Sequence, residues 1–479
     1  MYLVYMHNKK TLRCAPKMSL LECEMTILRH AIEANELATK SDTLNNPTII
    51  KIVNILERFL KKKKLICYGG TAINNILPKK LQFYDKLTEI PDYDFYSGNA
   101  LDDSIELADI YFKAGFTDVE AKAGVHFHTY KVFVNYIPIA DITHLPDSIL
   151  GSIRKDSITV SGILYAPPTF LKMNMYLELS RPAGDISRWE KVLKRLNLLN
   201  QHYALPNSTC KPVGQNTDIN DEQMKLTHDT IRNMAIDNSA VFFGGFSYFL
   251  YSQYSSNKHF NENVSQIPEF DILSIHAKKL SNDISSKLIQ LGIQNVNVIE
   301  HKEVGEIIPS HFEVKIKNTS VAFIYKPIAC HSFNTITISI GNSRNKKKKV
   351  EVNVATIDTM LSFYLAFYYS DKPYYHQDRI LCMTRLLFEI ENKNRTNQNG
   401  ILNRFTSSCY GTQETLTDIR IHKSNKFLEL KDKKGKREYD EWFLKYVPSE
   451  LTKKKNFTKK NGTSTKINKS LKQILGKSI

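Results

Sequence analysis

The chain has 479 residues, a formal net charge of +17 at pH 7 and a hydrophobic content of 42%. This length predicts two or three domains, and the excess of basic residues favours a polyanionic partner. No apolar run approaches the roughly twenty residues that span a bilayer, so a membrane protein is not expected. The N-terminus does not have the pattern of a signal peptide.

The seven cysteines are scattered along the chain. They form no CxxC pair and have no histidine partner at the spacing of a zinc site. This pattern predicts reduced structural thiols in an intracellular protein. The residues are Cys14, Cys23, Cys67, Cys210, Cys330, Cys382 and Cys409.

Two helices are predicted before the first strand. After a loose N-terminal arm, apolar residues recur close to helical spacing from Leu20 to Thr39. A second helix begins at Asn46-Pro47, since proline is tolerated in the first turn, and ends in the lysines of residues 61–64. Those lysines either complement the helix dipole or contact RNA.

A strand, a glycine pair and a short helix follow in the string LICYGGTAINN. The apolar run Leu65 to Tyr68 predicts a buried strand that ends at Gly69 and Gly70. Thr71 is then expected to cap a helix from Ala72 to Leu77, because its hydroxyl can accept an unpaired amide of the first turn. Free amides at a helix N-terminus bind phosphate readily. We therefore predict Gly69, Gly70 and Thr71 as nucleotide-binding residues.

Three aspartates are candidate metal ligands. Asp92 and Asp94 occur in IPDYDFYS and point the same way along a predicted strand, because side chains alternate between its faces. Two adjacent carboxylates repel each other unless a divalent cation lies between them. Asp141 stands alone among apolar residues in IPIADITHLP, where a buried unpaired charge would be unfavourable. We expect it to share metal ions with the first two. A strand end that turns toward solvent is the alternative.

Basic residues on two later helices are candidates for the triphosphate. Arg188 and Lys191 fall on one face of the second helix, together with Arg195, and Lys172 lies on the first. We predict that Lys172, Arg188 and Lys191 bind the nucleotide, with RNA contact or a solvated face as the alternatives. The other elements expected in this half are a helix at 101–114, β-rich segments at 116–121 and 125–142, and these two helices at 168–179 and 186–201.

The second half of the chain repeats the pattern of the first. AVFFGGFSYFL and IPEFDILS echo LICYGGTAINN and IPDYDFYS. Glu269 and Asp271 replace the first two aspartates, and Phe323 or a near neighbour stands where Asp141 stood. This predicts a copy that keeps the fold and has lost catalysis. A hairpin at 331–354 with a basic loop, helices at 357–369 and 377–391, and a lysine-rich disordered tail complete the chain.

A glycine pair followed by three strand aspartates matches the nucleotidyltransferase pattern of the polymerase-β superfamily, in which carboxylates hold two Mg²⁺ or Mn²⁺ ions. The strings YGGTAINN, PDYDFYS, ELAD, ADITHLP and RPAGDISRWEKVLKRLNLL resemble the poly(A) polymerase catalytic subunit of large cytoplasmic DNA viruses. The resemblance is strongest to the mimivirus-like giant-virus version and weaker to the poxvirus one.

This resemblance implies an α/β (α+β) protein with tandem nucleotidyltransferase-fold domains. It implies ATP as the donor, an RNA 3′ end as the acceptor, and Asp92, Asp94 and Asp141 as catalytic residues. A homodimer or a processivity subunit is a further expected partner. The expected location is a cytoplasmic viral replication factory, with packaging in the virion.

Five segments are expected: an N-terminal arm and helix (1–45), a catalytic domain (46–205), a linker (206–222), a degenerate copy (223–448) and a basic tail (449–479). Other nucleotidyltransferase activities, namely CCA addition, uridylylation or cyclic-dinucleotide synthesis, remain alternatives, because no residue selects adenine. A non-catalytic RNA-binding scaffold is the alternative from a different functional class.

Overall fold

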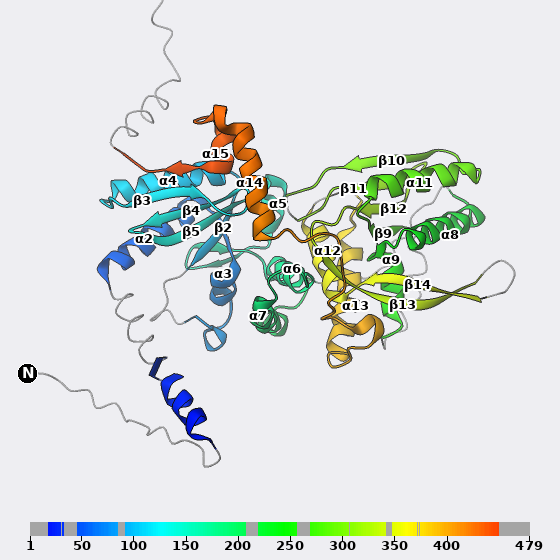
Figure 1. The fold of residues 1–479 in the computed structure, drawn as a ribbon, viewed down its shortest axis with the longest axis horizontal. Coiled ribbons are helices and arrows are strands. Elements are labelled where there is room, and N and C mark those ends of the chain that lie inside the picture. Colours follow the sequence, from blue (N-terminus) through cyan, green and yellow to red (C-terminus); the bar gives the residue numbers. More distant parts are fainter. Residues whose placement is uncertain are drawn as a thin grey trace, which may run out of the picture.

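The computed structural model describes residues 18–29, 31–32, 46–84, 92–206, 219–255, 269–305, 307–341, 347–370, 372 and 374–449. Each half of the molecule contains one eight-stranded mixed sheet with flanking helices (Figure 1). The predicted α/β class is therefore confirmed. Of the predicted N-terminal helix, the backbone is helical over 20–29 and 31–32. The predicted linker core (207–218), the basic hairpin loop (342–346) and the tail from residue 450 lie outside the described residues.

The first sheet has the strand order β16-β3-β4-β5-β2-β1-β7-β6. Strands β2 and β5 are parallel, and β1 is antiparallel to β2, so the glycine turn and the aspartate strands meet at the centre of the sheet. The strands are β1 (Ile66–Tyr68), β2 (Tyr93–Ser97), β3 (Val119–Ala123), β4 (Thr129–Val134), β5 (Ile137–His144), β6 (Ile158–Val160), β7 (Ile163–Tyr165) and β16 (Lys445–Tyr446).

One face of this sheet is covered by the helices α2 (Pro47–Lys63) and α4 (Ala100–Lys113). The Asn46 side chain accepts a hydrogen bond from the Thr48 amide and so begins α2, as the Asn-Pro signal predicted. Residues on the covered face, such as Phe95, Val132 and Ile142, are fully buried. Because side chains alternate along a strand, their neighbours in sequence project from the opposite face.

The second sheet has the order β10-β11-β12-β9-β8-β14-β13-β15. Its central pairings reproduce those of the first sheet: β8–β9 is antiparallel like β1–β2, and β9–β12 is parallel like β2–β5. The predicted repeat is therefore present in the topology. The strands are β8 (Val241–Phe242), β9 (Phe270–Leu273), β10 (Val296–His301), β11 (His311–Ile316), β12 (Thr319–Tyr325), β13 (His331–Gly341), β14 (Lys347–Ala355) and β15 (Cys409–Tyr410).

Helices from the two halves pack together between the sheets. Helix α6 (Pro168–Leu179) contacts α12 (Ile357–Tyr369), and the Tyr176 hydroxyl donates a 2.9 Å hydrogen bond to Glu391. Arg404 pairs with both Glu391 and Asp358, so these buried charges are compensated. The remaining helices are α3 (Gly69–Ile76), α5 (Asp147–Lys155), α7 (Trp189–His202), α8 (Asp221–Asp237), α9 (Gly245–Ser252), α11 (Ala277–Gln290), α13 (Gln377–Lys393), α14 (Leu416–Leu430) and α15 (Arg437–Phe443).

The end of the described chain returns from the second half to the first (Figure 1). From the sequence this segment is expected in the second copy (223–448), whereas β16 pairs with β3 and extends the first sheet. Arg437 forms a 2.9 Å ion pair with Asp102, and the Tyr446 hydroxyl donates a 2.6 Å hydrogen bond to Asp109. The edge of the first sheet is thus formed by residues more than three hundred positions away in the sequence.

The prediction of reduced cysteines is wrong for part of the chain. Cys330 and Cys409 form a disulfide across the β13–β15 pairing, with their Cα atoms 5.1 Å apart. Cys23 and Cys382 are also disulfide-bonded, and Cys67 is a free, buried thiol. Sequence spacing could not indicate the first bond, because 79 positions separate its two cysteines and only the sheet register brings them together.

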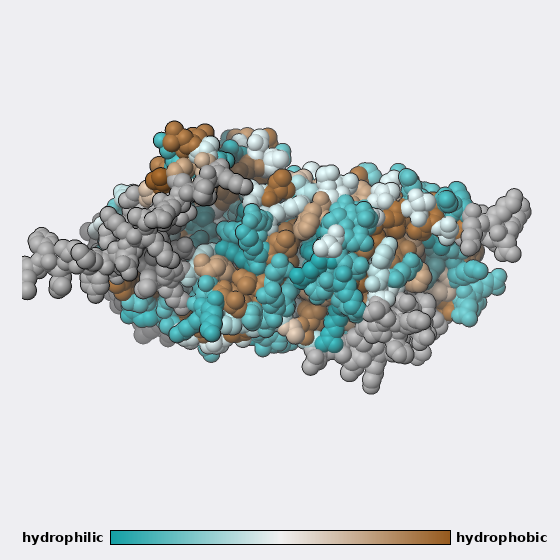
Figure 2. Space-filling view, turned by 90° about the horizontal axis from the view of Figure 1, so that it is seen from below, coloured by the Kyte–Doolittle hydropathy of each residue, from teal (hydrophilic) through white to brown (hydrophobic). Residues whose placement is uncertain are grey.

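The molecular surface is mixed in character. Figure 2 shows a face that is mostly hydrophilic, with apolar residues in scattered patches. Among the helices that the structure describes, none is both long enough and apolar enough to cross a membrane.

Candidate active site

The glycine pair lies at the junction of β1 and α3. Gly69 has φ +73°, a left-handed conformation that residues with a side chain rarely adopt. A Cβ atom there would also overlap the Oδ2 atom of Asp94, and one at Gly70 would overlap the Tyr84 hydroxyl. Gly69 therefore requires glycine on backbone grounds, whereas a side chain at Gly70 would displace the Tyr84 hydroxyl. The structure places the turn directly against a predicted catalytic carboxylate.

The predicted cap of the short helix is wrong in position. Helix α3 begins at Gly69, so Thr71 lies inside its first turn. The Thr71 hydroxyl donates a 2.5 Å hydrogen bond to the backbone carbonyl of Asp92. Thr71 therefore ties the glycine turn to the start of the aspartate strand. Tyr68, the residue at the N-cap position, makes no side-chain capping bond, so no N-cap side chain satisfies the first amides of α3.

Two of the predicted carboxylates lie side by side. Asp94 on β2 is in register with Asp141 on β5, and paired residues of adjacent strands project from the same face. Asp92 immediately precedes β2, two positions from Asp94. The structure thus brings the three predicted aspartates to one place on the face opposite α2 and α4.

The electrostatics of the cluster reflect this proximity. Burial raises the pKa of Asp94 to about 7, with further increases from the charges of Asp92 and Asp141, while Lys131 and Arg188 oppose the shift. The pKa of Asp92 is raised by burial and then by Asp141. Each ionised carboxylate disfavours ionisation of its neighbours, so an added positive charge would stabilise the ionised cluster.

One cation in the cluster, Lys131, is not predicted from the sequence. Lys131 on β4 is in register with Asp141, and its ammonium group forms an ion pair with the Asp141 carboxylate. The sequence shows that Lys131 lies in a strand whose side chains alternate in burial. It does not show which residue lies opposite, because that depends on the register of the hairpin between β4 and β5.

The donor set fits hard divalent cations, which prefer carboxylate oxygens. In the described part of the chain, no group of three or more His, Cys, Asp or Glu side chains lies close enough to hold a metal ion as the side chains stand. Burial and the neighbouring carboxylates raise the pKa of Asp92 and Asp94, and Asp141 pairs with an ammonium group, so a divalent cation would stabilise the ionised form of all three.

Of the three predicted basic residues, Lys172 is buried, whereas Arg188 and Lys191 are exposed on the surface. Lys172 has 2% exposure, and its ammonium donates a 2.5 Å hydrogen bond to the Tyr203 carbonyl, so it belongs to the core beside α7 and not to a nucleotide site. Its burial lowers its pKa to about 8. Arg188 is half-exposed, forms a 3.1 Å ion pair with Glu178 and influences Asp94. Lys191 is exposed on α7 and lies near Glu178.

Arg195 reaches the glycine turn, although it lay outside the predicted nucleotide-binding set. Its guanidinium donates a 2.7 Å hydrogen bond to the Tyr84 hydroxyl, which abuts Gly70. The same group lies 4.6 Å from the centroid of the Phe83 ring. The sequence feature that could have indicated this role is the position of Arg195 on the basic face of the helix predicted at 186–201, together with Arg188 and Lys191.

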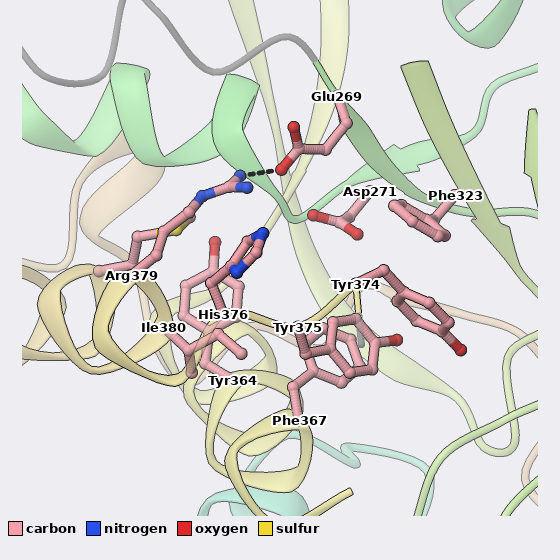
Figure 3. Close-up of a pocket in the computed structure, with 11 residues that line it drawn as sticks. Glu269, Asp271, Phe323, Tyr364, Phe367, Tyr374, Tyr375, His376, Arg379 and Ile380 are labelled. Carbon is pink, nitrogen blue, oxygen red and sulfur yellow. Dashed lines mark ion pairs between the residues drawn. The ribbon is translucent and has the colours of Figure 1, made fainter. Parts of the chain in front are cut away.

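The second sheet contains an equivalent site that is closed. Phe323 is in register with Asp271, as Asp141 is with Asp94, so the predicted loss of the third carboxylate is confirmed. Figure 3 shows the Arg379 guanidinium directed at Glu269, with which it forms an ion pair. Aromatic side chains fill the other side, and the remaining cavity of about 30 Å³ has room for about two water molecules. In the second site the internal cation Arg379 pairs with Glu269, whereas in the first site Lys131 pairs with Asp141.

Asp271 gives a prediction about stability. Burial, and then the charge of Glu269, raises its pKa to about 7 from an ordinary value of 3.8. The folded state therefore binds this proton more tightly, so stability from this group is highest below pH 4, falls between pH 4 and 7, and is level above. Asp271→Asn imitates the protonated form. The free energy of unfolding of the variant relative to the unmodified chain should increase by about 3 kcal/mol between pH 5 and pH 8.

Urea unfolding of both proteins at pH 5 and pH 8 measures this change. The difference between variant and unmodified chain is compared at the two pH values, so titrations that both proteins share cancel. Glu303→Gln, which removes an exposed carboxylate, is the matched control and should show no pH-dependent difference. Equal effects of Asp271→Asn at both pH values would mean that Asp271 is ionised in the folded protein.

The carboxylate cluster and the glycine turn both lie in the part of the chain that matches known proteins. Residues 54–185 match the model of one family, the poly(A) polymerase catalytic subunit. The resemblance noted in the sequence is thus confirmed. A protein of African swine fever virus assigned as a poly(A) polymerase catalytic subunit is 29% identical over 201 residues, which is 41% of each chain. A protein of Acanthamoeba polyphaga mimivirus with the same assignment is 30% identical over 175 residues, 35% of this chain and 29% of that one.

The matched region spans about two fifths of the length of the African swine fever virus relative. The fold extends much further than the sequence match. The crystal structure of the Megavirus polyadenylate synthase superposes with a TM-score of 0.75 at 19% identity, over 96% of this chain and 93% of that one. The two-sheet architecture described above is therefore that of a known fold, from the first sheet through the second.

Proposed function

We propose that this protein is a template-independent poly(A) polymerase that transfers AMP from ATP to RNA 3′ ends and releases pyrophosphate. The observation that carries the proposal is the in-register pair Asp94 and Asp141 beside the glycine turn. That arrangement falls within residues 54–185, the region that matches the poly(A) polymerase catalytic subunit. The catalytic domain expected from the sequence, residues 46–205, forms part of this proposal, together with strand β16, which extends the same sheet.

The glycine turn supports phosphate binding. The first amides of α3 lack a side-chain cap, and amides at a helix N-terminus attract phosphate. Arg195 and Arg188 place two guanidinium groups around the turn and the carboxylates. Arginine suits phosphate oxygens because its planar fork donates parallel hydrogen bonds. These groups would orient the triphosphate so that its α-phosphorus faces the aspartates.

The carboxylates support the transfer step. Asp92, Asp94 and Asp141 would hold Mg²⁺ or Mn²⁺, which would stabilise the developing charge and lower the pKa of the attacking 3′-hydroxyl. Lys131 neutralises Asp141 while no other cation is bound. Once that carboxylate has another partner, the Lys131 ammonium is free to contact a phosphate of the substrate. The closed second site takes no part in the chemistry.

Processivity, on this proposal, comes from the second half of the chain, the lysine-rich tail, a partner subunit or a second copy of the chain. The expected location, a viral replication factory in the cytoplasm with packaging in the virion, rests on the family resemblance of the sequence.

Nucleotide choice is the direct test of the proposed function. The purified chain is incubated with Mg²⁺ or Mn²⁺, a labelled RNA primer and each nucleoside triphosphate separately. We expect long extension with ATP and at least tenfold slower addition with the others. Comparable use of all four would favour a different nucleotidyltransferase activity. No addition at all, with RNA still bound, would favour the scaffold alternative.

A further inference from the structure

A row of lysines continues across the sheet from the carboxylates. Asp141 on β5 is in register with Lys131 on β4, Lys131 with Lys122 on β3, and Lys122 with Lys445 on β16. Residues paired in this way project from the same face. Lys131, Lys122 and Lys445, the lysine row, therefore form one rung that runs from the carboxylates to the edge of the sheet.

The lysine row lies on the accessible face. Its neighbours on the covered face, Ala121 and Val132, are completely buried. By contrast, the Lys131 and Lys122 side chains are 36% and 43% exposed, and Lys445 is exposed as well. Three positive charges on this face are thus available to a ligand that approaches the carboxylates.

Neighbouring groups hold the middle lysine in place without burying its charge. The Lys122 ammonium lies 4.0 Å from the centroid of the Phe133 ring and forms a 3.3 Å ion pair with Glu120. Exposed pairs of this kind contribute little free energy, so Glu120 does not prevent Lys122 from binding a phosphate. Phe133 adds an aromatic side chain beside the row, a combination common where single-stranded nucleic acid binds.

The row leads away from the donor site. The glycine turn follows β1, on one side of the carboxylates, whereas β4, β3 and β16 lie in succession on the other side of β5. A transferase needs its two substrates on opposite sides of the reacting phosphorus. A phosphate chain that lies along the row would therefore be the acceptor and not the triphosphate.

We propose that the lysine row is the track that binds the phosphates of the RNA primer upstream of its 3′ end. This inference rests on the proposed function. Adjacent strands are about 4.8 Å apart, so Lys445 lies about 14 Å from Asp141, or roughly four nucleotides at a stacked rise of 3.4 Å. Lys131 then serves the 3′-terminal phosphate, Lys122 the next ones, and Lys445 the outermost.

The test uses the full chain with Lys122→Ala, Lys445→Ala and the double variant. Binding of a fluorescein-labelled 20-nucleotide RNA is followed by anisotropy at several salt concentrations. Loss of two phosphate contacts should flatten the slope of log Kd against log salt by about 1.4 and weaken binding about tenfold at low salt. In transfer assays the KM for the primer should rise more than the KM for ATP. The Lys445→Ala defect should grow with primer length from two to about five nucleotides.

The matched control is Lys278→Ala with Lys287→Ala, which removes two exposed charges from α11 in the second half. It should bind RNA like the unmodified chain. If the lysine-row double variant has the affinity and salt slope of the unmodified chain, the proposal is wrong, and an acidic protein partner becomes the better occupant. The anisotropy measurement needs no catalysis, so absence of AMP transfer by the unmodified chain would reject the proposed function and leave this test intact.

Discussion

Asp94→Asn should reduce AMP transfer by about 10³-fold, the upper range seen when one electrostatic stabiliser of a transition state is removed. Asp94 interacts with both other carboxylates, because after burial the charges of Asp92 and Asp141 further raise its pKa. It also contacts the glycine turn, since a Cβ at Gly69 would overlap its Oδ2 atom. The substitution therefore removes a proposed metal ligand that lies against the glycine turn, while it keeps the side-chain volume.

The rate of single-nucleotide addition to a labelled primer measures this effect. Because Asn removes a partly buried negative charge, the variant should unfold at a temperature at or above that of the unmodified chain. Asp271→Asn is the control at the equivalent position of the second sheet, and it should retain full transfer activity. If Asp94→Asn kept more than a tenth of the activity, the three aspartates would not be the catalytic site. A comparable loss in Asp271→Asn would show that the second site is active.

Patterns local in the sequence predicted the fold well. The helix signals at Asn46-Pro47, the alternation of the strands and the internal echo of glycine and acidic residues all correspond to observed elements. The echo also placed Phe323 or a near neighbour where Asp141 stands, and the structure shows Phe323 in register with Asp271. Such features follow from the side-chain period of each element, which a single sequence displays directly.

Features that depend on pairing between distant segments could not be predicted. The hairpin register sets Lys131 beside Asp141, and the Cys330–Cys409 bond depends on the β13–β15 pairing. The return of β16 to β3 has the same origin, since two residues of edge strand carry almost no periodic signal. Each is decided by tertiary packing.

Basic residues were the least predictable part of the candidate site. Lys172 and Arg195 both fit a helix face that could serve a triphosphate. The structure buries Lys172 against the Tyr203 carbonyl and extends Arg195 to Tyr84 beside Gly70. A lysine with a long apolar stem can enter a core when a carbonyl accepts a hydrogen bond from its ammonium group, so charge alone does not reveal which side chain remains accessible.

Gly69→Ala should lower AMP transfer by about 10²-fold, the effect of misplacing a reacting group by about 1 Å. Two separate penalties act at this position. The left-handed conformation costs a residue with a side chain about 1–2 kcal/mol, and the new methyl group would displace the Asp94 carboxylate. The first penalty should reduce stability, and the second should reduce activity.

Two other glycines separate these penalties. Gly115 has φ +97° with nothing within 4 Å of a Cβ atom, so Gly115→Ala should cost about 1–2 kcal/mol of stability with normal transfer. Gly244 lies outside the left-handed region, but a Cβ there would overlap Asp271, so Gly244→Ala should disturb the closed site alone. Urea unfolding and primer extension on all three variants test the assignment. If Gly69→Ala loses no more activity than Gly115→Ala, the contact between the glycine turn and Asp94 is not needed for transfer. Loss of activity in Gly69→Ala alone would show that the turn positions the carboxylate and that its second copy retains only the packing role.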